Sequence, residues 1–385
     1  MQTSTDRVLT THTGSLPRPA SLTDRWDAPA VRAAVEETVR RQRDAGLDIV
    51  NDGEVSKPDY ATYVTERLSG FDGEPIDVQW PVRALSDFPE YYARQQAADG
   101  GPRGYPSNSG PVSYTGRAKV EADLARLKAA AGDGEMFMSA ASPGIIAWYL
   151  RSTYYRSTEE YLFALADAMK QEYDAIYQAG VVLQVDCPDL AATWETDPGL
   201  DTEGFRKQVA LRLEALDHAT RDIPPDRLRM HLCWGNDEGP HHTDVPLASF
   251  ADLVLAARPG AVLLEAANPR HEHEWTVFQD VKLPDGKVII PGVLDSTTNY
   301  IEHPELVAQR LIRYAGLVGK TNVIAGTDCG FASAADGPSV DPKVAWAKLA
   351  AMAEGARLAS DRLWGHASSY RTPNVDNRSE NDNIG

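Results

Sequence analysis

Eight short apolar runs, each ending in small or polar residues, recur along the 385-residue chain and limit its possible folds more than any other feature. Segments with helical spacing lie between most of them, and strands that alternate with helices pair in parallel through right-handed crossovers. The runs are Val8–Ser15, Asp48–Glu54, Met136–Pro143, Val181–Pro188, Leu228–Trp234, Ala261–Ala267, Val288–Asp295 and Asn322–Cys329. Eight such units predict an α/β fold of one kind, a single (β/α)8 TIM barrel.

The segments between the runs carry alanine and charged residues at helical spacing. They predict helices over Ala30–Ala45, Thr158–Ala179, Glu203–Arg221, Pro304–Gly319 and Asp341–Leu358. An open, doubly wound sheet is the alternative arrangement of the same elements. No Gly-x-Gly-x-x-Gly pattern follows the first run, which favours the barrel.

Two regions interrupt the repeat. Residues 72–116, rich in Pro, Gly and Tyr, form a long insert after the second strand, which we expect to be a lid, a dimer arm or a wall of the substrate site. Residues 366–385 are polar and are expected to be a disordered tail. The prediction is therefore one barrel domain over residues 1–365, with a homo-oligomer left open.

Composition narrows the class of protein. The chain has 56 acidic and 38 basic residues, a net charge of -18, which argues against nucleic acid or an anionic membrane as its partner. No window reaches the roughly 18 apolar residues of a membrane span. The first residues lack an apolar signal core, so a cytoplasmic location is expected. Three cysteines are too few for a disulfide framework. These properties favour an enzyme acting on small molecules.

Four potential metal ligands end three of the apolar runs: His231, Cys233, Glu265 and Cys329. The carboxyl ends of barrel strands meet at one rim, and these ligand types are typical of tetrahedral zinc. His231 and Cys233 alternate along one strand and so face the same side. The alternative is that the cysteines only pack in the core, that His231 bonds a backbone carbonyl and that Glu265 pairs with an arginine.

The predicted ligand set indicates a kind of chemistry. Two thiolates and a carboxylate leave zinc with a net negative charge, so it is a poor generator of hydroxide but can still hold an arriving thiol as thiolate. Sulfur alkylation is therefore favoured over hydrolysis. A structural zinc is the competing interpretation, although its ligands usually lie close together in loops. Five further carboxylates make the predicted rim anionic: Asp52, Glu54, Asp186, Asp295 and Asp328.

Several motifs together resemble the C-terminal catalytic barrel of cobalamin-independent methionine synthase. They are Thr-His-Thr-Gly-Ser15-Leu-Pro-Arg-Pro, Asn-Asp-Gly-Glu54, Leu-Gln-Val-Asp186-Cys-Pro, His231-x-Cys233, Glu265 and Asp-Cys329-Gly. The resemblance runs in order from about residue 8 to residue 360. It implies zinc bound by the four predicted ligands and methyl transfer to homocysteine. It also implies that Gly14 and Ser15 hold the thiol substrate, with Glu54 and Asp186 on its ammonium group.

The chain departs from that family in three ways. It resembles a short form with one barrel, and the family's proton-donating histidine after strand seven is absent from Val293–Asn299. His242 and Asp295 are candidate replacements. The Gly-Pro-His241-His242 stretch is also similar to epoxyalkane:coenzyme M transferases, so a methyl-folate, a corrinoid and an epoxide all stay open as alkyl donor. Trp148 is expected to wall the donor pocket or to pack in the core.

Charge bears on the choice of thiol acceptor. Homocysteine carries an ammonium group that Glu54 and Asp186 would satisfy, whereas those carboxylates would repel the sulfonate of coenzyme M. The basic residues on nearby loops that would have to compensate are Arg18, Lys57, Arg103 and Arg117. The sequence therefore favours an amino-thiol acceptor and leaves coenzyme M as the alternative.

Overall fold

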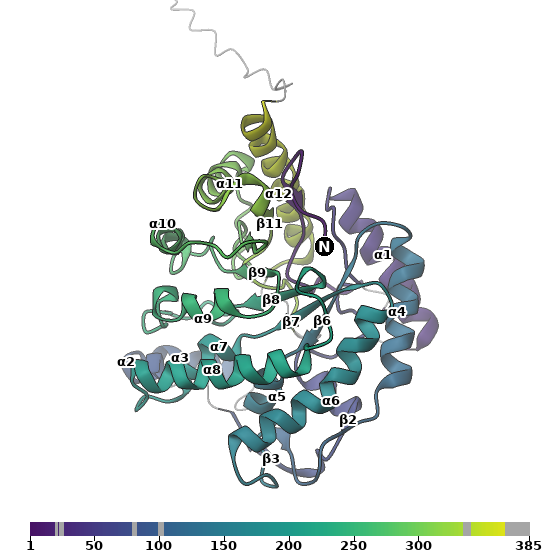
Figure 1. Ribbon diagram of the computed structural model, residues 1–385, viewed down its shortest axis with the longest axis vertical. Coiled ribbons are helices and arrows are strands. Elements are labelled where there is room, and N and C mark those ends of the chain that lie inside the picture. The colour runs from purple at the N-terminus through teal and green to yellow at the C-terminus, as the bar shows by residue number, and fades with distance from the viewer. Residues whose placement is uncertain (20–21, 23–26, 79–82, 99–103, 334–339, 366–385) are drawn as a thin grey trace, which may run out of the picture.

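The structure is a computed structural model that describes residues 1–19, 22, 27–78, 83–98, 104–333 and 340–365. Its centre is a sheet of five parallel strands in sequential order, with helices around it (Figure 1). The strands are β6 (Phe137–Ala141), β7 (Val182–Asp186), β8 (Leu228–Leu232), β9 (Ala261–Leu264) and β10 (Val288–Pro291). All residues of these strands are buried, as expected for a parallel sheet covered by helices.

Further parallel pairings continue the sheet on both sides. Strand β1 (Leu9–Thr10) pairs with β11 (Ile324–Ala325), and parallel bridges from Val323 and Gly326 connect β11 to β10. On the other side, one parallel bridge joins Val50 to Met136 next to β6. The backbone of residues 48 and 49 donates to the carbonyl of Thr10. Seven of the predicted strands are present, and the second is reduced to the bridge at Val50.

The helices follow the predicted alternation. They are α1 (Ala28–Asp44), α4 (Arg117–Ala131), α5 (Pro143–Tyr149), α6 (Thr158–Gln178), α7 (Asp189–Thr196), α8 (Thr202–Ala219), α9 (Ala251–Ala256), α10 (Val277–Asp280), α11 (Pro304–Val318) and α12 (Pro342–Trp364), with short 3-10 turns at η2 (Thr62–Glu66), η3 (Pro225–Arg227), η4 (Leu247–Ser249), η5 (Glu272–Thr276) and η6 (Lys320–Asn322). Side-chain caps start several of them: Ser157 accepts from Glu160 N and Asp201 from Gly204 N. Helix α12 continues six residues beyond its predicted end. No helix in the described ranges is long and apolar enough to cross a membrane.

The apolar core has two parts. A large cluster lies between the strands and the surrounding helices. A separate, smaller cluster takes one or two side chains from each of seven strand segments: Leu9, Ile49, Phe137, Val182, Ala261, Leu263, Val288, Ile290 and Ile324. Strand β8 contributes Arg229 instead, whose guanidinium lies 3.9 Å from the centre of the Phe137 ring and donates to Gln184 and Thr11.

The insert after the second run packs on its own chain. It holds the antiparallel pair β3 (Gly73–Asp77) with β4 (Gly104–Ser107) and the helices α2 (Arg83–Asp87) and α3 (Pro89–Ala98). Its last strand, β5 (Ser113–Tyr114), pairs antiparallel with β2 (Leu68–Ser69), which lies just before the insert. Arg83 donates to the carbonyls of Trp194 and Leu200, and the Tyr91 hydroxyl donates to the Glu238 carbonyl. These contacts hold α2 against α7 and the segment after it, and α3 against the loop that follows β8. The predicted tail, 366–385, lies outside the described residues.

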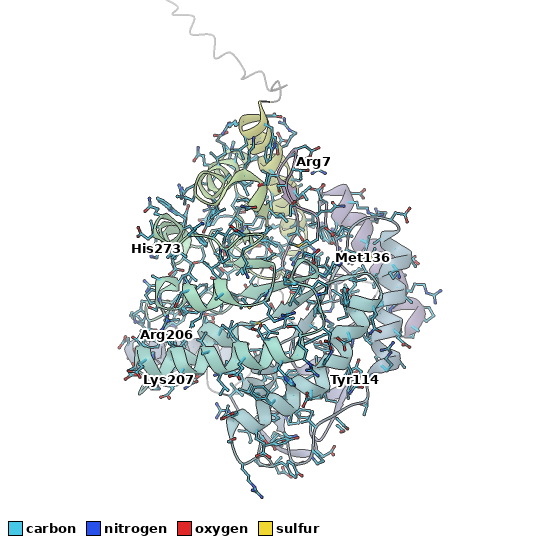
Figure 2. All side chains as sticks on the ribbon, viewed as in Figure 1. Arg7, Tyr114, Met136, Arg206, Lys207 and His273 are labelled. Carbon is cyan, nitrogen blue, oxygen red and sulfur yellow. The ribbon has the colours of Figure 1, made fainter. Side chains whose placement is uncertain are left out.

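A buried ion-pair network ties the insert to the helical layer. Arg67, 5% exposed, donates to Asp123 of α4 at 2.5 Å and to Glu172 of α6 at 3.0 Å. Tyr114, labelled in Figure 2, donates its hydroxyl to the other oxygen of Glu172 at 2.9 Å.

Replacing Arg67 by alanine would leave the buried carboxylate of Glu172 without its cation, whereas Asp123 would keep its ion pair with Arg126. We expect the free energy of unfolding to fall by about 3–5 kcal/mol, because breaking a buried pair leaves an uncompensated charge. Arg117→Ala is the matched control: that arginine pairs with Glu121 at the surface and is 56% exposed, so its loss should cost about 0–1 kcal/mol. Denaturant unfolding of both variants checks this, and equal losses would contradict it.

Candidate metal centre

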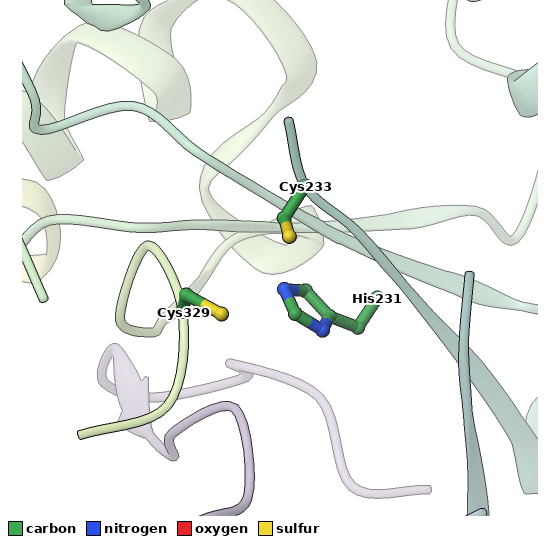
Figure 3. Close-up of side chains that lie close together, drawn as sticks. All are labelled: His231, Cys233 and Cys329. Carbon is green, nitrogen blue, oxygen red and sulfur yellow. The ribbon is translucent and has the colours of Figure 1, made fainter. Parts of the chain in front are cut away.

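Three of the four predicted metal ligands lie together where β8 and β11 end. His231 is in β8, Cys233 follows it on the same side, and Cys329 lies in the loop after β11. One ligand atom from each lies within 4.8 Å of the others, and all three side chains are buried. Figure 3 shows the two sulfur atoms and the imidazole turned toward one another. Neither cysteine is in a disulfide.

The unpaired atoms of this group fit a metal ion. The Nε2 atom of His231 is buried and makes no hydrogen bond to any part of the chain that the structure describes. Its Nδ1 atom lies 3.4 Å from a carboxylate oxygen of Asp186, the neighbouring residue on β7. An imidazole with one nitrogen beside a carboxylate and the other directed at two thiols is typical of a metal ligand. Two sulfurs and an imidazole nitrogen suit zinc.

The raised pKa values of this group make metal binding depend on the release of protons. Burial lowers the pKa of the His231 imidazole, but the Asp186 carboxylate and the Cys233 sulfur raise it to about 10. The adjacent Cys329 sulfur and burial raise the pKa of the Cys233 thiol well above its usual value. A metal ion bound here must displace these protons, so its affinity falls as the pH falls.

Glu265, the fourth predicted ligand, lies outside the group of three. It follows β9 and is buried, and both carboxylate oxygens accept hydrogen bonds: one from Trp234 N at 2.7 Å and one from the Asn268 side chain at 2.6 Å. Burial raises the pKa of its carboxyl group. Its role as a metal ligand stays a prediction.

A cavity of about 260 Å³ opens on the group of three and contains the predicted substrate residues Ser15, Glu54, Trp148 and Asp186. The carboxylate of Glu54 accepts a hydrogen bond from the Ser139 hydroxyl at 2.6 Å. Burial, opposed by Lys57 and reinforced by Asp186, raises the pKa of Glu54 to about 7. The cavity therefore places two carboxylates beside two thiols and an imidazole.

Backbone geometry marks the same region. Among the described residues other than glycine, Glu54 and His241 alone have positive φ, at 57° and 52°. Such conformations cost about 1–3 kcal/mol each and cluster at functional sites. Gly14 does not line the cavity but lies behind Glu54: a Cβ atom on it would come within 2.3 Å of the Glu54 carboxylate. Only glycine leaves room for that carboxylate.

A second cavity, of about 410 Å³, adjoins the first, because Gly235 and Asp237 line both. Glu265, Asp295 and His241 line the second cavity. Asp295 accepts hydrogen bonds from Thr297 N and from both neighbouring threonine hydroxyls.

The predicted catalytic residue His242 lies apart from both cavities. Its side chain is 35% exposed, pairs with Asp87 at 2.9 Å and packs edge-on against Phe88. Cys187 is buried outside the group of three, with its sulfur 3.6 Å from the Val185 carbonyl. Its placement favours a packing role.

The basic residues considered for a sulfonate have other partners. Arg18 donates to the Lys57 carbonyl, Lys57 donates to the Ser139 carbonyl, and Arg117 pairs with Glu121. Arg103 lies outside the described residues. No described lysine or arginine lines the first cavity.

Sequence reasoning missed a second group of potential ligands. His241, Asp244 and His271 place one ligand atom each within 4.8 Å of one another. Asp244 Oδ2 lies 2.7 Å from His241 Nδ1 and 3.0 Å from His271 Nε2, and the His271 ring stacks on Trp234 at 4.3 Å. The His-x-x-Asp spacing over residues 241–244 was a signal in the sequence, but nothing local indicated His271.

Fold and site together define an α/β protein with a thiol and imidazole group at the carboxyl ends of parallel strands. No family model matches the chain. Methionine synthase from Saccharolobus solfataricus is 23% identical over 324 residues, 83% of this chain and 81% of that protein. Methionine synthase from Saccharolobus islandicus strain L.S.2.15 is 24% identical over 377 residues, 92% of this chain and 95% of that protein.

Solved structures show the same fold. A B12-independent methionine synthase from Shewanella sp. W3-18-1, in complex with selenomethionine, superposes with a TM-score of 0.72 over 93% of this chain and 99% of that one, at 19% identity. The chain is thus a homologue of proteins named methionine synthase, in agreement with the resemblance of its motifs.

Proposed function

We propose that the chain is a zinc-dependent thiol methyltransferase that methylates homocysteine or a related amino-thiol. One observation carries the proposal: His231, Cys233 and Cys329 converge beside a cavity that also holds Glu54 and Asp186. The relatives named methionine synthase support the same activity. Small-molecule substrates also agree with the net charge of -18.

The architecture that would position this site is a closed (β/α)8 barrel over residues 1–365. The parallel pairings that join β1 to β11, β11 to β10 and Val50 to Met136, with the hydrogen bonds from residues 48 and 49 to Thr10, support closure. So does the small apolar cluster, which draws on seven strand segments and would fill the barrel interior. The insert 72–116 would form a wall over the loop after β8, as its contacts with that loop suggest.

Each residue of the proposed site would have a separate role in binding zinc or the acceptor. His231, Cys233 and Cys329, with Glu265 as the fourth ligand, would hold zinc, which when bound supplies a means of keeping the acceptor sulfur as thiolate. Glu54 and Asp186 would bind the acceptor's ammonium group. Ser15 would hold the acceptor from the loop after β1, and Trp148 would close the cavity against water.

The lining of the cavity favours an amino-thiol over coenzyme M. Its carboxylates attract an ammonium group and repel a sulfonate. The basic residues near it are bonded to backbone carbonyls or to surface carboxylates. Homocysteine therefore matches the charge of the cavity.

Cobalt-substituted protein tests this proposal. Titration with homocysteine should add a saturable sulfur-to-cobalt absorption band, because the acceptor sulfur joins the site as thiolate. Titration with coenzyme M over the same range should leave the spectrum unchanged. A thiolate-ligated cobalt spectrum that neither thiol alters would indicate a closed, structural site and would contradict the proposal.

A further inference from the structure

The proposed reaction needs a proton donor if the alkyl group leaves a nitrogen or an oxygen. The sequence offers His242 and Asp295, and neither is well placed. His242 pairs with Asp87 outside both cavities. Asp295 is held by three hydrogen bonds from Thr297 and Thr298.

The residue before His242 is better placed. His241 lines the second cavity together with Glu265 and Asp295, and its side chain is 16% exposed. Its backbone has the left-handed φ of 52° that side chains rarely adopt outside functional sites. The second cavity adjoins the acceptor cavity through Asp237, so a donor bound in the second would face an acceptor bound in the first.

The oxygen atoms around the His241 ring indicate which of its two nitrogens carry hydrogen. Nδ1 lies 2.7 Å from Asp244 Oδ2, and Nε2 lies 3.2 Å from the Asp237 carbonyl and 3.6 Å from its carboxylate. These oxygens only accept hydrogen bonds, so both ring nitrogens carry hydrogen and the ring is an imidazolium. Burial lowers the pKa of His241, but hydrogen bonds to Asp237 and Asp244 raise it to about 12.

A second imidazole, that of His271, contacts the same carboxylate oxygen of Asp244. Asp244 Oδ2 also lies 3.0 Å from His271 Nε2, and His271 Nδ1 lies 3.0 Å from a carboxylate oxygen of Glu274. Each ring nitrogen of His271 therefore also faces an acceptor. This carboxylate and imidazole chain fixes the His241 ring by Nδ1 and leaves the Nε2 proton on the backbone carbonyl of Asp237, a residue that lines both cavities.

Other charged groups reach His241 from neighbouring elements. Glu265, after β9, interacts electrostatically with both His241 and His271. Tyr92 of α3 interacts with Asp237 and Asp244, and burial raises the pKa of its hydroxyl, so it stays uncharged. Glu195 of α7 also interacts electrostatically with Asp244. The surroundings are therefore anionic and keep the imidazolium charged.

We propose that His241 Nε2 donates the proton to the leaving atom of an alkyl donor bound in the second cavity. The donor would then be one whose leaving nitrogen or oxygen takes up a proton, an N-methyl amine of the methyl-folate kind or an epoxide, rather than a corrinoid. This inference rests on the proposed function and names the donor class for the same site.

The step balances in atoms and charge. The acceptor sulfur forms a bond to the alkyl carbon while the bond from that carbon to nitrogen or oxygen breaks. The electron pair of the broken bond takes the proton from Nε2, and Nδ1 keeps its hydrogen toward Asp244. The proton that the acceptor thiol lost on binding equals the one consumed, and water returns a proton to Nε2.

Steady-state turnover of zinc-loaded protein tests the proposal, with homocysteine as acceptor and methyltetrahydrofolate, epoxypropane or methylcobalamin as donor. His241→Asn is the test variant, because asparagine tolerates a left-handed backbone; His242→Asn is the matched control. With methyltetrahydrofolate or epoxypropane, His241→Asn should lower kcat about 100-fold or more, and His242→Asn should change it less than about twofold. Metal content and homocysteine binding should be unchanged in both.

The pH profile separates proton donation from a structural role. The kcat of the wild-type protein should be nearly flat from pH 6 to 8. In His241→Asn, kcat should fall about tenfold for each pH unit, because the proton must then come from solvent.

Several outcomes would overturn the inference. The inference would be overturned if only methylcobalamin, of the three donors, supported turnover. It would also be overturned if His241→Asn had an unchanged kcat and pH profile. Both results would leave the proposed function in place. Loss of one of two bound metal ions in that variant would show a second cation site at His241, Asp244 and His271 instead. Turnover with none of the three donors would contradict the proposed function and this inference together.

Discussion

Cys329→Ser protein is expected to lose its bound metal and its methyltransferase activity together, with a fall in activity of about a thousandfold or more. Cys329 supplies one of the two sulfurs that converge on His231 Nε2, an atom without another partner in the described structure. A serine hydroxyl is a harder, far less acidic ligand than a thiol and binds zinc weakly in its place. Metal content by elemental analysis and turnover of homocysteine give the two readouts.

Cys187→Ser is the matched control for this loss. Cys187 is equally buried but lies outside the group of three, beside the Val185 carbonyl, to which a serine hydroxyl can donate. This variant should keep its metal and most of its activity. A Cys329→Ser protein that stays fully active without metal would refute the proposed role of the site.

Glu54→Gln protein should bind homocysteine about 10- to 100-fold more weakly, because a hydrogen bond to a charged group contributes about 1.5–3 kcal/mol. Glutamine keeps the size of the side chain and its bond to the Ser139 hydroxyl, so the metal content should not change. Glu54 gives the cleaner test of the carboxylate pair, since Asp186 also lies 3.4 Å from the His231 imidazole. KM values and cobalt titrations measure the loss.

The pH dependence of this binding has a defined sign. Burial raises the pKa of Glu54 to about 7, so the carboxyl group is neutral below that pH and charged above it. Binding of an ammonium group should therefore strengthen as the pH rises through about 7 in the wild-type protein. Glu54→Gln should lack this component, while the contribution from the thiol of the acceptor remains in both proteins.

4-Mercaptobutyrate, which is homocysteine without its amino group, is the control ligand. Its affinity should be the same for the wild-type and Glu54→Gln proteins. Equal weakening for both thiols would show that Glu54 shapes the cavity and does not recognise an ammonium group.

Much of the fold could be predicted from periodicity. Seven of the eight apolar runs are strands or parts of strands, and helix α11 begins at Pro304 and ends before Gly319 as expected. The second run, Asp48–Glu54, is only a bridge at Val50, because its end turns into the positive φ of Glu54. Helix α12 passed its predicted end because its last turns, to Trp364, pack on neighbouring elements, which the local pattern did not reveal.

The sequence by itself determined the alternation of strands and helices and the position of His231, Cys233 and Cys329 at strand ends. Both follow from local rules, since side-chain periodicity sets the element and parallel strands bring their carboxyl ends to one rim. Only the tertiary structure decided which of two adjacent histidines, His241 or His242, reaches a cavity. One left-handed residue in the loop after β8 turns His241 inward and His242 toward Asp87.

The partner of His241 was equally a matter of tertiary structure. His271 lies on a different loop, and its contact with Asp244 exists only because the loops after β8 and β9 are neighbours in the folded chain. Spacing along a sequence fixes which way a strand residue faces, but loop geometry depends on what packs against the loop. The sequence therefore determined the predicted metal ligands at the strand ends, and the fold decided the loop residues around them.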